Sequence, residues 1–251
     1  MTLRFVLMVL VVACALCCVS ALPAQNISEQ YLLEAANSDR TAHGLAPLRP
    51  DARLSQAARV HAYEMVKHGN VSHQFSGEHD LAARAGEAGA HFSLVTENVA
   101  EAPTSAVIHD LWMRSAGHRA NLLDPQVDSV GIAVIQQGRQ LYAVEDFSRT
   151  VERVPIENQE ASVGELISQT GVIVAPTTRE ARQTCTMKTG YAGSRQPWFV
   201  MRYTSADLRR LPQELTARLA TGKYHEAVVG ACQTGSKTSF TSYSVAVLLF
   251  P

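Results

Sequence analysis

Apolar side chains recur at helical spacing near the start of the chain. Residues 28–43 place Tyr31, Leu32 and Ala35 on one face. Ser28 is the expected N-cap and Gly44 the expected end, because hydroxyl side chains cap helices and glycine tolerates the left-handed backbone that closes them. The pattern therefore predicts a first amphipathic helix over residues 28–43.

A second helix is predicted over residues 51–68. Its apolar stripe comprises Leu54, Ala58, Ala62, Met65 and Val66. Asp51 precedes the stripe as an N-cap, and Gly69 follows it as a C-cap. Residues 74–90 are rich in Gly, Ala and charge, which predicts a loop with one turn of helix at most.

A third helix is expected to begin at Thr104 or Ser105. Its expected buried positions are Ala106, Val107, Leu111 and Trp112. Further along, the period changes from helical to alternating. Residues 128–136 and 140–147 alternate apolar and polar side chains around Gln137-Gly138-Arg139, which is typical of a β-hairpin. Helices combined with an antiparallel hairpin predict an α+β sandwich.

A polar, charged stretch divides the chain. Residues 151–162 contain Pro155 and are interpreted as a linker. Strand-like runs follow at 172–174, 198–203, 227–229 and 243–250, and a helix is expected from Pro212 to Gly222. No internal repeat is visible in the residue pattern. The predicted organisation is a leader at 1–24, a first domain at 25–150, the linker, and a small α+β domain at 163–251 of no recognised family.

The N-terminus has the pattern of a cleaved export signal. Arg4 precedes an apolar run over residues 5–19, and small residues follow it. The run is short for a membrane span, and polar residues come directly after it. A lipid anchor at Cys14 is the alternative, which the apolar residues after Cys14 disfavour. We therefore expect a secreted or cell-envelope protein with no transmembrane span in the mature chain.

Cysteine usage agrees with export. Cys14, Cys17 and Cys18 fall in the leader, so the mature chain keeps Cys185 and Cys232. An isolated pair in an exported chain is most simply a disulfide, here closing a loop of about 47 residues. Two unrelated buried thiols are the alternative.

Composition and motifs exclude several functional classes. Hydrophobic residues make up 46% of the chain, and the formal net charge of −1 offers no basic field for nucleic acid or anionic membranes. No phosphate loop, dinucleotide-binding glycine pattern or His-Glu-x-x-His is present. Ser72 beside His73, and Ser115 near His118, are sequence neighbours without a third partner. Nothing here identifies an enzyme, and the balance is against one.

Three side chains able to transfer protons or bind a metal lie among small and apolar residues. They are His73, Glu97 and His118, each in a separate segment. They form one site only if the fold brings them together. A carboxylate in an apolar segment needs a partner or takes up a proton, so a structural ion pair at Glu97 is the alternative to a functional role. For His118, the alternative is a hydrogen bond that fixes a loop.

The motifs around these residues occur in a specific order. They are Asn37-x-x-Arg40, Gly44-Leu45-Ala46-Pro47-Leu48, Ser72-His73, Glu97-Asn98-Val99-Ala100, Trp112-x-x-Ser115-x-Gly117-His118-Arg119-x-Asn121-Leu122, Val130-Gly131-Ile132-Ala133-Val134 and Tyr142-Ala143-Val144-Glu145-Asp146-Phe147. The ordered set resembles the CAP superfamily (cysteine-rich secretory proteins, antigen 5 and pathogenesis-related proteins), in the form found in secreted bacterial members. The resemblance covers roughly residues 28–149. It implies an α-β-α sandwich for this part of the chain.

The resemblance also implies a central cleft lined by His73, Glu97 and His118. Many eukaryotic members add a second Glu where this chain has Ser115. Two imidazoles and one carboxylate still match a three-ligand zinc site, so a weakly bound divalent metal is the cofactor expectation. Candidates to replace the missing carboxylate are Glu78, His79 and Glu101. Structural roles are expected for Asn37, Arg40, Asn98, Trp112 and Asn121.

Three functions remain open at this point. The first is a non-catalytic extracellular binding protein whose cleft takes a lipid, a glycan or a protein partner. The second is a metal-dependent, peptidase-like hydrolase in which Glu97 or His118 acts as the base. The third is a structural envelope protein whose polar cluster only stabilises the fold. The sequence names neither the ligand nor the role of the C-terminal domain.

Overall fold

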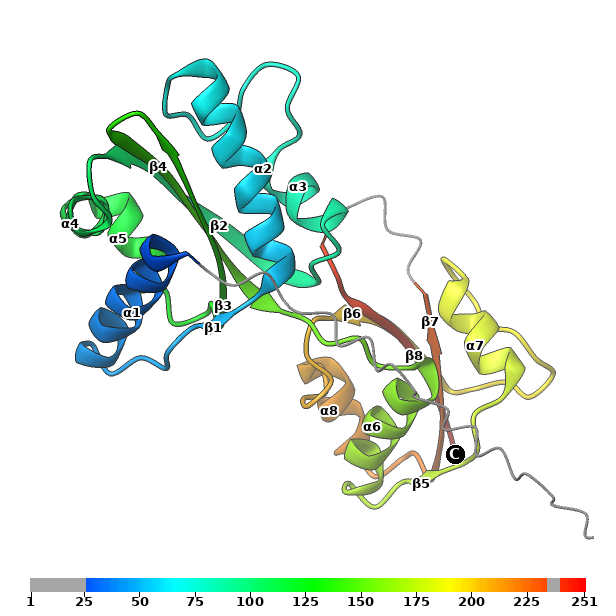
Figure 1. Ribbon diagram of the computed structural model, residues 1–251. Helices are drawn as coiled ribbons and strands as arrows, with labels where there is room; N and C mark the ends of the chain where they lie inside the picture. The colour runs from blue at the N-terminus through cyan, green and yellow to red at the C-terminus, as the bar shows by residue number, and fades with distance from the viewer. Residues whose placement is uncertain (1–25, 234–239) are drawn as a thin grey trace, which may run out of the picture.

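The computed structural model describes residues 26–233 and 240–251 and contains two four-stranded sheets, each covered by helices (Figure 1). The predicted leader, with Cys14, lies outside the described residues. In the part of the chain that is described, no helix is long and apolar enough to cross a membrane.

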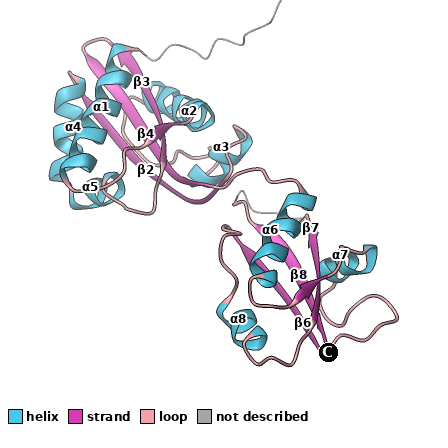
Figure 2. Cartoon of the chain, turned by 90° about the horizontal axis from the view of Figure 1, so that it is seen from below, coloured by secondary structure: helices cyan, strands magenta, loops and turns pink. Residues whose placement is uncertain are grey.

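The N-terminal sheet has the strand order β1-β3-β4-β2. Its strands are β1 (Arg49–Pro50), β2 (Phe92–Ala102), β3 (Ser129–Gln137) and β4 (Gln140–Thr150). β1 pairs with β3 in parallel, and the other pairs are antiparallel. Helices α2 (Ala52–His68) and α3 (Leu81–Glu87) cover one face, while α1 (Ile27–Ala42), α4 (Ser105–Arg114) and α5 (Ala116–Leu122) cover the other (Figures 1 and 2). This is the predicted α-β-α sandwich.

The caps of the first two helices show where the local sequence signals predicted the helix ends correctly and where they did not. Asp51 accepts hydrogen bonds from the first-turn amides of α2, and Gly69 ends that helix at φ 60°, as predicted. The predicted cap of α1 at Ser28 is wrong. Asn26 caps the helix, because its side chain accepts from the Glu29 amide while the Glu29 carboxylate accepts from the Asn26 amide.

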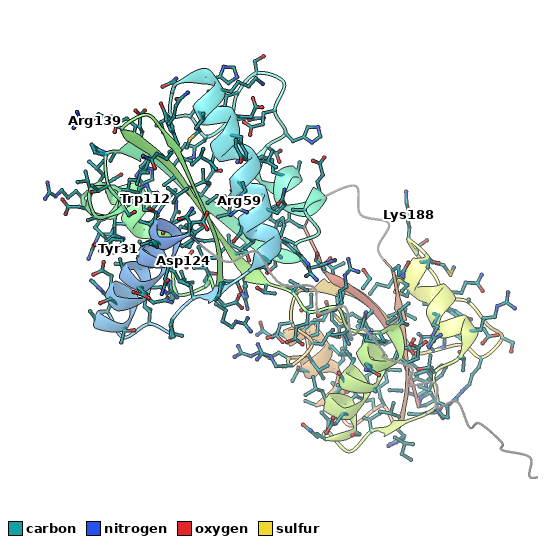
Figure 3. All side chains as sticks on the ribbon, in the orientation of Figure 1. Tyr31, Arg59, Trp112, Asp124, Arg139 and Lys188 are labelled. Atoms are coloured by element: carbon teal, nitrogen blue, oxygen red, sulfur yellow. A yellow bond between two sulfur atoms is a disulfide. The ribbon has the colours of Figure 1, made fainter. Side chains whose placement is uncertain are left out.

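The predicted buried face of the third helix is also partly wrong. α4 begins after Thr104 as expected, but Val107 and Leu111 are 45% and 47% exposed, and Ala106 is exposed as well. Ile108 and Trp112, one helical turn apart, are the buried residues. Trp112 is labelled in Figure 3. Its indole N–H donates to the Val99 carbonyl at 3.1 Å, and this bond to β2 sets the rotation of the helix. On α1, Tyr31 is likewise 42% exposed, contrary to its predicted position.

Three elements of the N-terminal part have no counterpart in the sequence prediction. The stretch 74–90 contains α3, a seven-residue helix capped by Asp80, where at most one turn was expected. α5 forms directly after α4, and β2 runs for 11 residues through the Glu97 segment. The hairpin of β3 and β4 is confirmed.

The C-terminal domain holds the second sheet, with the order β5-β7-β8-β6. Its strands are β5 (Ile173–Val174), β6 (Phe199–Ser205), β7 (Glu226–Cys232) and β8 (Tyr243–Phe250). Helices α6 (Ile156–Ser168) and α8 (Gln213–Leu219) pack on one face through Val163, Ile167, Leu215 and Leu219, and α7 (Arg179–Thr186) covers the other (Figure 2). Residues 156–162 of the predicted linker are therefore helical, because α6 buries an apolar stripe against this sheet.

The predicted disulfide is confirmed. Cys185 in α7 and Cys232 at the end of β7 are bonded, with their Cα atoms 5.8 Å apart. The bond ties the single helix on this face to the sheet.

The two sheets repeat one topology that the sequence did not reveal. In each, a short strand pairs in parallel with the third strand, whose hairpin partner then pairs with the second strand. An equivalent backbone hydrogen bond follows the parallel pair in each sheet. Asp51 N–H donates to Val130 O in the first sheet, and Ala175 N–H donates to Ala227 O in the second. Val130 in β3 and Ala227 in β7 are thus equivalent, so the structure repeats a topology although the residue pattern shows no repeat.

An ion pair with a buried carboxylate and a partly exposed arginine is repeated with the topology. Glu29 in α1 accepts from Arg59 Nη2 of α2 at 3.0 Å and from Val134 N–H of β3 at 3.2 Å. In the second sheet, Glu160 accepts from Arg182 of α7 at 2.7 Å and from Ala231 N–H of β7 at 2.9 Å. Val134 and Ala231 each lie four residues beyond the equivalent Val130 and Ala227. Each carboxylate therefore joins helices on opposite sides of its sheet.

Candidate functional site

Strand β2 carries the central residues of the site. Because successive side chains of a strand point to opposite faces, Glu97 faces α2 and α3 while Asn98 faces α5. Glu97 and Asn98 are 6% and 0% exposed. Their cross-strand partners in β4 are Asp146 and Glu145, so polar side chains lie on both faces at the same point of the sheet.

His73 lies directly on Glu97. Its Nδ1 is 2.8 Å from Glu97 Oε1, and because a carboxylate oxygen accepts, this nitrogen carries the proton. The His73 side chain is 61% exposed, which leaves the other ring nitrogen accessible. The hydrogen bond to Glu97 raises the pKa of His73, against an opposing effect of partial burial.

His118 completes the exposed part of the site. It lies in α5, and its ring centroid is 6.2 Å from that of His73. Burial, followed by the neighbouring His73 charge, lowers the pKa of His118. The two imidazoles are therefore neighbours with opposite tendencies: His73 favours the cation and His118 the neutral ring.

A network of buried polar side chains lies beneath the exposed pair, His73 and His118. Arg84 in α3 donates from Nη2 to Glu97 Oε2, and from Nη1 to the His79 carbonyl at 3.0 Å. Arg84 Nη1 also lies 3.6 Å from Glu78 Oε1. Arg84 is 4% exposed, so its charge is compensated inside the protein.

His61 of α2 joins this network. Its Nδ1 lies 2.7 Å from Glu78 Oε1, and its Nε2 lies 2.7 Å from the Ser72 carbonyl. The Glu78 carboxylate accepts in turn from the Phe75 amide at 3.0 Å. The loop that carries His73 is therefore fixed by bonds to buried side chains.

The carboxyls of β4 are the most deeply buried acids of the site. Asp146 and Glu145 are both 0% exposed. Burial raises the pKa of Glu145 to about 8. Burial and the adjacent Glu97 charge raise the pKa of Asp146 well above its usual range. Glu145 is therefore expected to be largely protonated at neutral pH, and the same burial favours the uncharged form of Asp146.

Close packing explains why α2 seals this face. Gly131 of β3 pairs with Asp146, and a Cβ added at Gly131 would lie 2.1 Å from the Leu54 and Ser55 backbone of α2. Only glycine permits this approach. The helix therefore lies directly over the sheet beside Asp146.

The residues assigned to structural roles make structural contacts. Arg40 donates to four backbone carbonyls, those of Ala46, Leu122, Asp124 and Val127. Asn37 exchanges two hydrogen bonds with the Leu48 backbone. Asn121 donates to the Asn98 side chain and to the Glu97 carbonyl, and Asn98 donates to the His118 carbonyl. These bonds connect α5, and with it His118, to β2.

The candidates for a fourth cleft residue are placed differently. Ser115 lies between α4 and α5 and makes no side-chain cap bond there. His79 lies within ion-pair distance of Glu87. Burial, followed by the charge of Glu101, raises the pKa of Tyr142. Of the three suggested replacements, Glu78 alone belongs to the network under the site.

Sequence reasoning missed Arg84, His61, Glu145 and Asp146. His61 did leave a signal, since it is the polar residue within the apolar stripe of the second helix. Arg84 left none, because it lies in an Ala-rich stretch that was expected to be a loop.

The site does not fit a resident metal ion. The described residues include no group of three or more His, Cys, Asp or Glu side chains arranged to hold one. Both Glu97 oxygens already accept hydrogen bonds, from His73 and from Arg84, and the Arg84 charge opposes a second cation. The zinc expectation is therefore not supported by the donor set.

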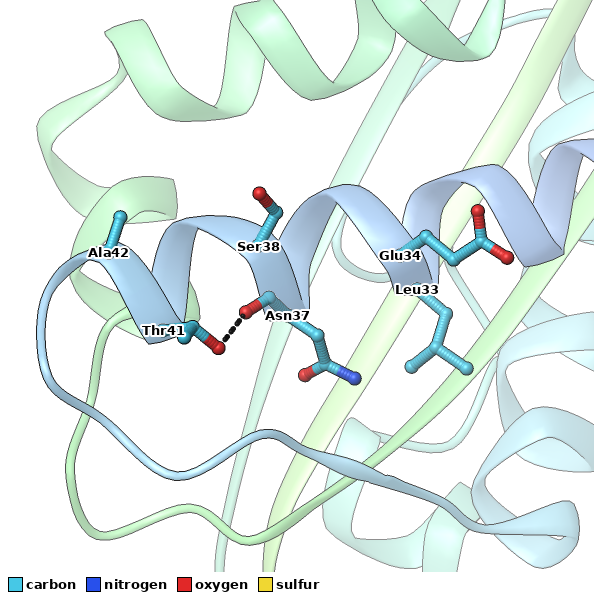
Figure 4. A pocket seen from close by; sticks show the side chains of 6 residues that line it. All are labelled: Leu33, Glu34, Asn37, Ser38, Thr41 and Ala42. Carbon is cyan, nitrogen blue, oxygen red and sulfur yellow. Dashed lines mark hydrogen bonds between the residues drawn. The ribbon is translucent and has the colours of Figure 1, made fainter.

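Surface hollows lie away from this cluster. One, lined by six residues of α1, is shown in Figure 4 (Leu33, Glu34, Asn37, Ser38, Thr41 and Ala42). A neighbouring hollow between α1 and α4 includes the exposed Tyr31 and Val107 together with Met113. Both are shallow, so we place the candidate site at the polar residues and not at these hollows.

Comparison with known proteins agrees with this architecture. The cysteine-rich secretory protein (CAP) family matches residues 33–147. The uncharacterized protein YkwD of Bacillus subtilis is 29% identical over 114 residues, which is 44% of this chain and 43% of that protein. The chain thus spans less than half the length of this curated relative.

Two solved structures are also similar. An extracellular protein containing an SCP domain from Bacillus anthracis is 27% identical, with a TM-score of 0.45 over 49% of this chain and 40% of that one. A cysteine-rich secretory protein from Staphylococcus aureus is 22% identical, with a TM-score of 0.41 over 49% and 39%. The family match and the ordered motifs support a CAP superfamily assignment for residues 33–147.

Proposed function

We propose that this is an exported, non-catalytic binding protein whose ligand contacts His73 and His118. The observation that carries the proposal is the state of Glu97. Its two oxygens accept from His73 Nδ1 and from Arg84, so its charge is already paired inside the protein and it orients the His73 ring. The rings of His73 and His118, 6.2 Å apart, remain available to a ligand.

The electrostatics of the two rings favour a hydroxyl-rich ligand such as a glycan. His73, with its raised pKa, offers a charge-assisted donor, whereas His118, with its lowered pKa, offers a neutral ring that both donates and accepts. A sugar hydroxyl is itself a donor and an acceptor. Export is supported by the predicted leader and by the Cys185–Cys232 disulfide.

Binding of soluble cell-wall glycan fragments to the mature protein tests the proposal. His73→Gln and His118→Gln are each expected to weaken binding roughly tenfold or more, the order of one hydrogen bond to a charged or polar partner. His225→Gln, an exposed histidine of the C-terminal domain, is the matched control and is expected to bind as the wild type does.

Other outcomes point to the remaining functions. Release of shortened glycan or peptide products would identify a hydrolase. Binding of fatty-acid micelles that depends on Val107 and Leu111, and not on the histidines, would move the ligand to the exposed apolar residues of α4. Absence of any binding, with unfolding of His118→Gln, would favour a structural role.

A further inference from the structure

His91 lies where the two domains meet. It directly precedes β2 of the N-terminal domain, and its ring contacts residues from two other parts of the chain. Arg153, in the connection between the domains, places Nε 2.6 Å from His91 Nε2. Thr241, two residues before β8 of the C-terminal domain, places Oγ1 3.2 Å from His91 Nδ1. Three segments that are far apart in the sequence therefore meet at one imidazole.

The two contacts determine the protonation state of the His91 ring. The Arg153 Nε–H group can only donate, so His91 Nε2 is the unprotonated, accepting nitrogen. The ring proton is then on Nδ1, which donates to the Thr241 hydroxyl oxygen. Only the neutral imidazole in this one tautomer makes both contacts. Protonation of His91 would set one N–H donor against another at the Arg153 contact.

Backbone bonds and an aromatic contact extend the junction on both sides of His91. The Thr241 amide donates to the Phe92 carbonyl at 2.8 Å, and the ring of Phe240 lies edge-on to that of Phe92, with 5.2 Å between the centroids. On the other side, the Val151 amide donates to the His91 carbonyl at 2.9 Å. The residues before β8 and the residues after β4 are thus both held at the start of β2.

The charges around His91 oppose its protonation. Arg153 and Arg53, which lies in the first turn of α2, are cations, whereas Asp51 at the N-cap of α2 acts in the opposite direction. Burial, followed by the two arginine charges, lowers the pKa of His91. The closed arrangement therefore favours the neutral ring. Its stability is complete above about pH 6.5, the ordinary pKa of histidine, and is lost as pH falls through the lower pKa of the closed form.

We propose that His91 is an acid-sensitive clasp between the two domains: the neutral ring holds Arg153 and Thr241 together, and the protonated ring releases Arg153 and loosens the junction. The clasp borders a hollow of about 520 Å³ between the domains, which Tyr243 and Cys232 also line. Release of the clasp opens this hollow and frees the domains to change their relative orientation. Histidine suits this task, because its charge changes in the range between about pH 5 and pH 8.

The test is hydrogen exchange of the Thr241 amide in the mature protein, followed by NMR without any ligand. The protection factor, which is the exchange rate relative to the chemical rate at the same pH, reports how often the junction opens. From about pH 7.5 to about pH 5.5, the protection of Thr241 in wild type should fall about three- to tenfold, the order of one hydrogen bond. The ring signals of His91 should titrate with a midpoint below about 6.5 over the same range.

Three substitutions assign this change to the clasp. His91→Gln offers an amide oxygen to Arg153 and an amide N–H to Thr241 but does not titrate, so the protection of Thr241 should stay constant with pH. Arg153→Gln removes the opposing charge and should raise the pKa of His91 and reduce the pH dependence. His43→Gln is the matched control and should behave as wild type does. His43 Nε2 also lies 3.0 Å from an arginine nitrogen, that of Arg119, but this pair lies within the N-terminal domain.

Constant protection of Thr241 in wild type, while the His91 ring titrates, would overturn the proposal. So would a His91→Gln protein that keeps the pH dependence of wild type. Should His91→Gln fail to fold, Arg153→Gln decides: an unchanged pKa of His91 together with an unchanged pH dependence would overturn the clasp. The proposal does not depend on the ligand proposed above, because every measurement is made on the free protein.

Discussion

At the centre of the N-terminal sheet Glu97 lies opposite Asp146, and at the equivalent point of the C-terminal sheet Val200 lies opposite Leu248. The equivalence follows from Val130 and Ala227, whose partners on the hairpin are Phe147 and Leu249. Asp146 precedes Phe147 in β4, and Leu248 precedes Leu249 in β8, so Asp146 and Leu248 are equivalent.

On the other face of the sheets, a polar pair in the N-terminal sheet again corresponds to an apolar pair in the C-terminal sheet. Asn98 lies opposite Glu145 in the first sheet, and Met201 lies opposite Val247 in the second. The C-terminal sheet therefore forms the same topology with apolar side chains where the N-terminal one buries three acids and an amide. Because burying acids costs free energy, the comparison indicates that this topology does not require the polar layer in order to form.

The largest expected effect comes from making the C-terminal sheet polar. Leu248→Asn should destabilise that domain by roughly 5 kcal/mol, since it removes a buried side chain and leaves an amide without partners. The matched change Asp146→Asn should cost only about 1 kcal/mol, because burial and the Glu97 charge raise the pKa of Asp146 and so favour its uncharged form, and the two side chains have the same shape. Urea unfolding of both variants measures the difference. Similar losses in the two domains would contradict the comparison.

The disulfide is expected to be the next largest contributor, and only in the C-terminal domain. Its 47-residue separation corresponds to about 4 kcal/mol in the chain-entropy account. The double substitution Cys185→Ala and Cys232→Ala should lower the unfolding temperature of this domain. The transition of the N-terminal domain, followed by the Trp112 fluorescence, should remain where it is; a shift there of the same size would show that the two sheets unfold as one unit.

Glu145 makes the N-terminal domain sensitive to pH. Its pKa is about 8 in the folded protein against an ordinary value of 4.5, so the unfolded chain loses this proton first as pH rises. The loss of folding free energy caused by burying Glu145 is absent below about pH 4.5 and grows up to about pH 8. It reaches roughly 3 kcal/mol at pH 7.

Glu145→Gln, with no proton to lose, should therefore be more stable than wild type at pH 8, by an amount that shrinks toward pH 5. Thermal unfolding across this range checks the sign. Val247→Gln, at the equivalent position, is the control and should be destabilising at every pH. A stability gain for Glu145→Gln that does not change with pH would exclude titration as its cause.

The smallest effect is expected from separating the two domains. Residues 25–150 should fold alone and lose roughly 1–2 kcal/mol, because only a few contacts cross. They include the Thr241 N–H bond to Phe92 O at 2.8 Å and the edge-on contact of Phe240 with Phe92. Calorimetry of the fragment should give one cooperative transition. A fragment without one would show that the C-terminal sheet completes the first core.

Local signals in the sequence were sufficient for several elements. Asp51 and Gly69 bound the second helix as predicted, because caps act on backbone groups within a few residues. Gly138 marks the hairpin, and the uninterrupted apolar run at 243–250 forms β8. The disulfide followed from counting cysteines in an exported chain. For the site, the ordered motifs were enough to name His73, Glu97 and His118.

Tertiary structure alone decided which of these side chains are buried and what they contact. The apolar spacing of α4 allowed Val107 and Leu111 to be core residues, and the Trp112 bond to β2 turned them outward. Arg84 carries no sequence signal, since its role depends on Glu97, 13 residues away on another element. The repeat of the fold was hidden because backbone pairing sets the topology, whereas Glu97, Val200 and their partners differ in chemistry. A sequence records each residue's own preferences, but the free energy of a buried charge depends on the neighbours that only the folded chain supplies.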